Sequence, residues 1–197
     1  MKRHYEVLNL GELLELSGEV ICNHLLSSFI CKKNKDVQYY LTHNAIEFNK
    51  QKVAMTYLVF CIKNEEPKIV GYYTLTNKCV SVPLKNISKT LQRKIKKFAQ
   101  YDDSGQNFQL PMPLIAQLGK DDTNQDLIDG KELLEMALTK VKQAQNLIGG
   151  KTTFIECASV PKLEEFYKNN GFRWFGTNDS NDNVSLDQMM FYYKDVQ

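Results

Sequence analysis

The sequence predicts a mixed α/β (α+β) fold, organised as a single domain over residues 1–197. Residues 55–63 and 69–76 are rich in β-formers and flank a turn at 64–67, which predicts a hairpin. An apolar strand, 114–118, precedes a polar loop and an amphipathic helix, and a second strand–helix pair follows it. A chain of 197 residues with 43% hydrophobic content can bury one core.

The N-terminal half alternates short helices with strands. In chain order we expect an edge strand at 5–8, helices at 18–28 and 37–48, the hairpin strands, and a further short strand at 79–82. The next strand, 108–118, contains Pro111 and Pro113. Proline has no N–H to donate to a sheet, so we expect these two residues to interrupt the strand.

Between these strands lies a basic segment, residues 84–100, with six basic residues and no acidic one. One helical face is apolar, which predicts a basic amphipathic helix inserted at this point; its residues are Leu84, Ile87, Leu91, Ile95 and Phe98. Two interpretations stay open. The helix is either an ordinary solvated surface or a contact surface for RNA phosphates or for an acidic partner.

The C-terminal half contains a strand, a loop and a helix in the order that favours anion binding. The helix has apolar side chains three and four residues apart, at Leu133, Leu134, Ala137, Leu138, Val141, Ala144 and Ile148. The first N–H groups of a helix lack intrahelical acceptors, and the helix dipole favours negative charge there. Neither GxxxxGK[ST] nor GxGxxG is present, so neither common nucleotide-binding loop is indicated.

Two motifs resemble those of the GNAT acetyltransferases. The loop Gln125–Gly130 resembles the family's Q/R-x-x-G-x-G/A motif, with Ile128 in place of the middle glycine. Downstream, a strand at 152–158 precedes the segment Val160–Phe172, which resembles the family's helix with F-Y-x-x-x-G-F. Pro161 suits the first turn of that helix and Gly171 suits its C′ position. Many members have asparagine where this chain has Val160.

The resemblance implies a GNAT fold. Its central sheet is mixed, mostly antiparallel and twisted, with a splayed pair of central strands and flanking helices. The resemblance extends to bacterial GNAT toxins, which acetylate aminoacyl-tRNA and carry extra residues where the basic segment lies. Residues 70–75, VGYYTL, are similar to a strand of that subgroup. A homodimer and, for a toxin-like member, an antitoxin are the protein partners it implies.

The resemblance also implies acetyl-CoA as co-substrate and direct attack of a primary amine on the thioester. Backbone groups near Leu118 and Lys120 would hold the pantetheine arm, and the loop would hold the pyrophosphate. The loop residues concerned are Gln125, Asp126, Leu127, Ile128, Asp129, Gly130 and Lys131. Asp126 and Asp129 would have to point away from the anion. Tyr167 matches the family's tyrosine, a phenol that can protonate the departing thiolate.

No residue is an evident general base. Gln117 cannot take a proton, Glu156 is more typical of an outward-facing strand residue, and the three histidines precede the catalytic half. An α-amino group, with a pKa near 8, is partly neutral at cellular pH and needs less help than a lysine. The acceptor stays open among a small-molecule amine, a protein N-terminus and an aminoacyl-tRNA.

Composition predicts a cytoplasmic protein. Five scattered cysteines form no CxxC or Cys/His cluster, so we expect no metal site, and no stretch reaches the roughly 18 apolar residues that span a membrane. Two other classes stay open. One is a catalytically inactive acyl-CoA-binding domain, because Ile128 replaces a glycine. The other is a nucleic-acid-binding protein that uses the basic helix.

Overall fold

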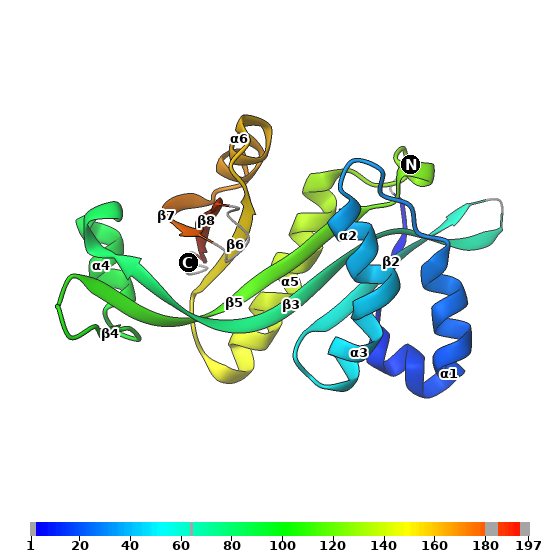
Figure 1. Cartoon of the computed structure of the whole chain (residues 1–197), viewed down its shortest axis with the longest axis horizontal. Coiled ribbons are helices and arrows are strands. Elements are labelled where there is room, and N and C mark those ends of the chain that lie inside the picture. Colours follow the sequence, from blue (N-terminus) through cyan, green and yellow to red (C-terminus); the bar gives the residue numbers. More distant parts are fainter. Residues whose placement is uncertain (1–2, 64, 180–184, 194–197) are drawn as a thin grey trace. The chain divides into compact units, whose positions relative to one another are not determined.

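The computed structural model describes residues 3–63, 65–179 and 185–193 (Figure 1). Asn64, in the expected hairpin turn, lies outside the described residues. The strands form an open sheet in the order β1-β2-β3-β5-β6-β8-β7, with β4 paired to β5. Of the strand pairs with a described register, only β5 and β6 run parallel. The predicted mixed, mostly antiparallel sheet is therefore confirmed.

The elements of the chain fall into two compact units. Unit 1 comprises Met1–Thr76 with Ala116–Leu138, and unit 2 comprises Asn77–Ile115 with Thr139–Gln197. Three elements contribute residues to both units: β3 (Glu66–Pro83), β5 (Asn107–Lys120) and α5 (Gly130–Ile148). The single-domain organisation over 1–197 stays a prediction.

Unit 1 begins with β1 (Tyr5–Asn9), which pairs with β2 (Met55–Lys63), and β2 pairs with β3. Between β1 and β2 lie α1 (Leu10–Ser27), α2 (Lys35–Tyr39), a π-helical turn (Tyr40–Asn44) and α3 (Ala45–Lys50). Figure 1 shows the three helices gathered beside β2. Their buried side chains form one core with those of β2 and β3: Leu10, Leu26, Phe29, Val37, Leu41, Ile46, Leu58, Phe60 and Tyr72.

The helix α1 begins earlier than the sequence predicted. Asn9 caps it, because the Asn9 side-chain oxygen accepts a hydrogen bond from the Gly11 N–H at 2.8 Å. Gly18, with φ of 77° and ψ of 164°, breaks the helix into two helical runs, of which only the second was expected. The predicted helix at 37–48 corresponds to α2, the π-helical turn and α3.

Unit 2 contains the basic segment, and here the prediction of one helix over 84–100 is wrong. The segment begins with a 3-10 turn (Leu84–Asn86), continues as α4 (Lys89–Ile95) and ends at β4 (Gln100–Tyr101). The Ser88 hydroxyl accepts from the Leu91 N–H at 3.2 Å and so starts the helix after the turn. The Gln92 side chain donates to the backbone oxygens of Leu84 and Ile87, which keeps the preceding turn folded against α4.

The strand β5 continues through Pro111 and Pro113, so the expected interruption is also wrong. The two prolines lie between the positions that pair with β4, at Phe108 and Gln109, and the one that pairs with β6, at Leu114. Neither of these two described ladders pairs a proline, so neither needs the missing N–H groups. The Pro113 carbonyl accepts from the Thr153 hydroxyl at 2.8 Å.

The remaining strands of unit 2 are β6 (Thr152–Ala158), β7 (Arg173–Asp179) and β8 (Ser185–Tyr192), with α6 (Pro161–Asn169) between β6 and β7. The β5–β6 ladder has a single described pair of partners, Leu114 and Phe154, which fits the splayed strands that the resemblance implies. By contrast, β8 pairs along the whole length of β6. Pro161 starts α6, and Gly171 follows it with φ of 89°, as predicted.

Candidate functional site

Two strands near the candidate site have no room for a side chain at one position each, Gly119 on β5 and Gly71 on β3. A Cβ on Gly119 would lie 2.4 Å from Val37 Cγ1 and 2.9 Å from Tyr72 Cε1. A Cβ on Gly71 would lie 2.9 Å from the Gly119 carbonyl oxygen. Both residues must therefore be glycine, and they fix the backbone on which Leu118 and Lys120 lie.

Asp121, immediately after β5, anchors the loop that follows. It is 1% exposed, and its Oδ2 accepts from the Ile30 N–H at 2.8 Å. Its Oδ1 accepts from the Thr123 N–H at 2.9 Å, from the Thr123 hydroxyl and from the Asn124 amide. A buried carboxylate with several donors is well satisfied. Asp121 thus ties the segment after α1 to the start of the candidate phosphate loop.

A short 3-10 turn (Asp122–Asn124) brings two lysines to Gln125. Lys33 Nζ donates to Gln125 Oε1 at 3.2 Å, and Lys120 Nζ donates to the Gln125 carbonyl at 3.3 Å. Asp122 holds the Lys33 segment in place, since its Oδ2 accepts from the Lys32 N–H at 2.6 Å. Two cations therefore flank the first residue of the loop, in a position to attract an anion.

The middle of the loop turns its apolar side chain inward. Ile128 is 1% exposed, so the residue that replaces the family's glycine points into the core of unit 1. The Leu127 carbonyl accepts from the Tyr5 hydroxyl at 2.7 Å, which ties the loop to β1. Ile128 therefore adds no side chain to the exposed face of the loop.

Asp129, which was expected to point away from a bound anion, has its carboxylate at the start of α5 and caps this helix. Asp129 Oδ1 accepts from the Glu132 N–H at 2.7 Å, and Glu132 Oε2 accepts from the Asp129 N–H at 3.0 Å. This reciprocal pair is a capping box, which satisfies donors at the helix start. The N–H groups of Gly130 and Lys131 still find no acceptor in the described part of the chain.

Both negative and positive side chains surround the loop, and one of the positive ones, Lys33, was not identified from the sequence. Asp126 is exposed and makes no hydrogen bond with the described residues, whereas Lys33, Lys120 and Lys131 supply positive charge. Lys33 lies 92 residues from Gln125 in the chain, so spacing could not reveal the contact. The only available signal was the run of lysines after α1, in Cys31–Lys35.

Tyr167, in unit 2, lies on α6 among aromatic rings. It is 8% exposed, with ring centroids 5.1 Å from Phe166 and 5.5 Å from Phe172. Its hydroxyl makes no hydrogen bond with the described residues, so the proton is free to be donated. Burial, with a smaller contribution from Cys157, raises the pKa of the Tyr167 phenol well above its usual value. The phenol therefore stays protonated at physiological pH.

Glu156, also in unit 2, is a largely buried, hydrogen-bonded carboxylate and not an outward-facing strand residue. Its side chain is 12% exposed, and Lys78 Nζ lies 3.1 Å from Oε2. Oε1 accepts from Asn178 at 2.9 Å and from Gln188 at 2.8 Å. Lys78, Asn178 and Gln188 thus all donate to this carboxylate. The three histidines are exposed, as the sequence suggested.

Within the described residues, no group of three or more His, Cys, Asp and Glu side chains could hold a metal ion. The five cysteines are free thiols. Burial, followed by the charge of Asp187, raises the pKa of the Cys157 thiol to about 11. Among the helices that the structure describes, none has the length and hydropathy to span a bilayer.

No protein-family model matches the sequence, and neither does any curated protein. Solved structures do resemble it. A structure of AtaT complexed with acetyl-methionyl-tRNAfMet has a TM-score of 0.64 at 22% identity, covering 93% of this chain and 94% of that one. A tyrosine-to-phenylalanine mutant of KacT has a TM-score of 0.66 at 20% identity, covering 95% of each chain. A KacTA–DNA complex has a TM-score of 0.60 at 17% identity, covering 96% and 93%. The chain therefore has the GNAT fold that its motifs implied, shared with AtaT and KacT over nearly its whole length.

Proposed function

We propose that the protein is an N-acetyltransferase that moves an acetyl group from acetyl-CoA directly to a primary amine. The observation that carries this proposal is the loop Gln125–Lys131. It opens a 19-residue helix, leaves the N–H groups of Gly130 and Lys131 without an acceptor among the described residues, and lies between Lys33 and Lys120. Such a helix start binds phosphate groups.

In this proposal the loop holds the pyrophosphate of acetyl-CoA through backbone N–H groups from Gln125 to Lys131. Lys33 and Lys120 neutralise its charge, and backbone groups of Leu118 and Lys120 hold the pantetheine arm. The buried Ile128 leaves the loop's surface open to this ligand. Structures of AtaT with acetyl-CoA, including one of AtaTR, support this co-substrate for the shared fold.

We assign Tyr167 the role of general acid. The amine nitrogen attacks the thioester carbonyl, the C–S bond breaks, and the phenol gives its proton to the sulfur while the new ammonium loses one to water. The Tyr167 hydroxyl makes no hydrogen bond with the described residues, and the raised pKa of the phenol keeps it protonated at neutral pH, as a proton donor must be. Solved mutants of both AtaT and KacT replace a tyrosine by phenylalanine, which supports a functional role for a tyrosine in proteins of this fold.

Direct attack is preferred to an acetylated cysteine. The Cys157 thiol is buried, with a pKa of about 11, and is therefore not a thiolate at neutral pH. Cys79 is exposed but lies on β3 with no base among its described contacts. A ternary complex therefore suits the chain better than a two-step transfer.

The acceptor we propose is the α-amine of an aminoacyl-tRNA. With Glu156 held by Lys78, Asn178 and Gln188 and no other base evident among the described residues, an amine that is already partly neutral at pH 7–8 suits the chain best. AtaT has been solved with acetyl-methionyl-tRNAfMet, which supports this class of acceptor in a chain of this fold. A free small amine and a protein N-terminus are the competing acceptors.

The test is transfer of radiolabelled acetyl from acetyl-CoA to three acceptors at equal concentration: charged tRNA, free amino acids, and a peptide with a free N-terminus. We expect label on the aminoacyl end of the tRNA. Label only on the free amino acid or the peptide would overturn the acceptor. Tight acetyl-CoA binding with no transfer to any amine would instead favour an inactive acyl-CoA-binding domain.

A protein partner belongs to the same proposal. AtaT has been solved bound to the C-terminus of the antitoxin AtaR. In unit 1, α1 exposes Leu16, Val20 and Ile21 at 85%, 84% and 60%. Exposed apolar clusters are typical of interaction surfaces. We propose that a second copy of the chain or an antitoxin covers them, and the solution mass of the purified chain separates these two partners.

A further inference from the structure

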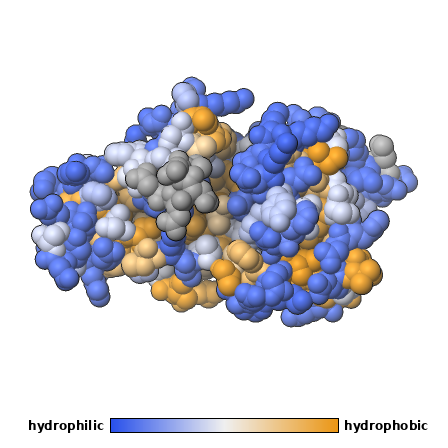
Figure 2. Space-filling model, in the orientation of Figure 1, coloured by the Kyte–Doolittle hydropathy of each residue, from blue (hydrophilic) through white to orange (hydrophobic). Residues whose placement is uncertain are grey.

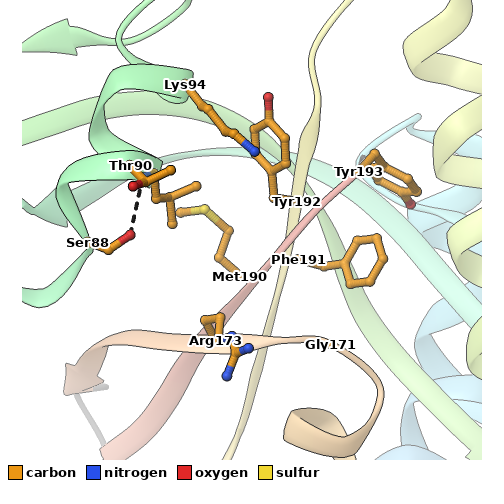
Figure 3. Close-up of a pocket in the computed structure, with 10 residues that line it drawn as sticks. Ser88, Thr90, Lys94, Gly171, Arg173, Met190, Phe191, Tyr192 and Tyr193 are labelled. Carbon is orange, nitrogen blue, oxygen red and sulfur yellow. Dashed lines mark hydrogen bonds between the residues drawn. The ribbon is translucent and has the colours of Figure 1, made fainter. Parts of the chain in front are cut away.

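Unit 2 contains a pocket of about 620 Å³ that the acetyl-transfer machinery does not use (Figure 3). It lies between α4, the start of β7 and the end of β8. Its walls include Thr90, Leu91, Lys94, Arg173, Met190 and Tyr192. Pockets of this size suit a small molecule or one unit of a polymer.

One wall pairs a cation with an aromatic ring. Lys94 extends from α4 toward Tyr192, and its Nζ lies 5.0 Å from the ring centroid (Figure 3). Arg173 lies on β7 opposite Met190 of β8. Neither Lys94 nor Arg173 has a carboxylate partner among the described residues. Both charges are therefore available to an anionic ligand.

The floor of the pocket is apolar. Met190 is 2% exposed, and Leu91 and Tyr192 are half-buried beside it. The Thr90 hydroxyl makes no hydrogen bond with the described residues. A ligand that fits here needs a flat or apolar part for the floor, a polar group for the hydroxyl and negative charge for the rim.

The basic segment extends this charge beyond the pocket. Lys85, Lys89, Arg93, Lys94, Lys96 and Lys97 are all exposed, and residues 84–101 contain no acidic residue. The surface over α4 is hydrophilic in Figure 2. A mononucleotide would use only the cations of the pocket, whereas a nucleic-acid strand would also use those along α4.

We propose that the Lys94–Tyr192 pocket holds one unpaired nucleotide of an RNA strand. The base stacks on Tyr192 over Met190 and Leu91, a 2′-hydroxyl reaches Thr90, and Lys94, Arg173 and the basic segment neutralise the phosphates. The choice of RNA as the ligand rests on the proposed aminoacyl-tRNA acceptor. The inference adds the place on unit 2 at which that RNA binds.

An acidic peptide is the competing ligand. Its carboxylates would satisfy the cations, but they would gain nothing from a flat ring beside an apolar floor. Bases stack on aromatic side chains in single-stranded nucleic acids, and cations near the ring reinforce that stacking. The combination of Tyr192 with an unpaired lysine therefore favours a nucleotide.

The test measures fluorescence anisotropy of a labelled single-stranded RNA, its fully paired duplex and a polyglutamate peptide at several salt concentrations. Tyr192→Leu keeps an apolar side chain but removes the ring, so we expect at least about a fivefold loss of single-strand affinity, since stacking contributes ~1–3 kcal/mol per base. Tyr192→Phe keeps the ring and should bind normally. Lys94→Met should lower the salt slope by about 0.7, the value for one phosphate contact on a single strand.

Lys142→Glu, an exposed charge reversal on α5, is the matched control and should leave affinity unchanged. Far-ultraviolet circular dichroism checks that each variant folds. Equal RNA affinity of folded Tyr192→Leu and Tyr192→Phe would overturn the proposal. Tighter binding of polyglutamate than of RNA at equal salt would also overturn it, in favour of a protein partner.

Failure of the inference is distinguishable from failure of the proposed function. If charged tRNA is acetylated with the same KM by wild type, Tyr192→Leu and Lys94→Met, the pocket assignment is wrong and the function stands. If no amine is acetylated but RNA binding responds to Tyr192→Leu as expected, the pocket assignment stands without the transferase activity.

Discussion

The buried carboxylate of Asp121 accepts a hydrogen bond from the backbone N–H of Ile30 at 2.8 Å. The two residues are 91 positions apart, and the contact joins the segment after α1 to the loop that opens toward α5. It also brings Lys33 within reach of Gln125. The candidate phosphate site is thus built from two distant stretches of chain that one side chain holds together.

Replacing Asp121 by alanine should destabilise unit 1. The Ile30 and Thr123 N–H groups would lose their acceptor in a buried position, at a cost of about 1–3 kcal/mol. Chemical denaturation should show this loss as a lower midpoint with an unchanged m-value. Asp121→Asn keeps one acceptor oxygen and should lose less. Equal stability of wild type and Asp121→Ala would show that the carboxylate does not anchor the loop.

Lys33→Glu should weaken acetyl-CoA binding by about tenfold, or 1.4 kcal/mol, because it places a negative charge beside the phosphate loop. Lys52→Glu, an exposed reversal in the same unit, is the control and should bind normally. Isothermal titration calorimetry measures both. A normal affinity for Lys33→Glu would remove this lysine from the site.

Asp126→Asn should have the opposite effect and strengthen acetyl-CoA binding. The Asp126 carboxylate is exposed in the loop and opposes any bound anion, whereas the amide is neutral. The gain should shrink as salt rises, because salt screens exposed charges. If Asp126→Asn bound acetyl-CoA more weakly than wild type in low salt, Asp126 would instead contact the co-substrate favourably.

Tyr167→Phe should lower kcat by about 10²–10⁴-fold and preserve acetyl-CoA affinity, since it removes one hydroxyl and little volume. The pH profile offers a second readout. Because burial raises the pKa of Tyr167, the acid stays protonated. Wild-type activity on an α-amine should therefore rise through about pH 8 and show no fall before about pH 10. Near-normal turnover of Tyr167→Phe would move the acid role to water or to another residue.

Elements with strong local signals could be predicted from the sequence. The structure contains α5, β6 and α6 where the sequence predicted a helix, a strand and a helix. Apolar periodicity, Pro161 and Gly171 are local signals, because each lies within the element it predicts or next to its end. The loop proposed to bind the pyrophosphate was chosen for the same reason, since its sequence lies next to the helix it opens, and its ligand stays a prediction.

Features that depend on distant contacts could not be predicted. Local side-chain bonds can also override a periodic pattern: the basic segment has a regular apolar pattern, but Gln92 donates to the carbonyls of Leu84 and Ile87, which favours a turn before a short helix. The strand β5 continues through Pro111 and Pro113, and the described pairs with β4 and β6 lie on either side of them. Lys33 and the full set of Glu156 partners depend on the tertiary fold, which no spacing in the sequence encodes.

The central claim is that acetyl-CoA binds the loop that opens α5. Calorimetry of acetyl-CoA with wild type, Gly130→Val and Ala144→Val tests it most directly, because both variants add a β-branched side chain to α5 and only the first lies at its start. We predict at least a tenfold loss of affinity, about 1.4 kcal/mol, for Gly130→Val, because close backbone approach of the phosphates is blocked. Ala144→Val should bind like wild type. An unchanged affinity of folded Gly130→Val, or no binding of acetyl-CoA by wild type, would contradict the account.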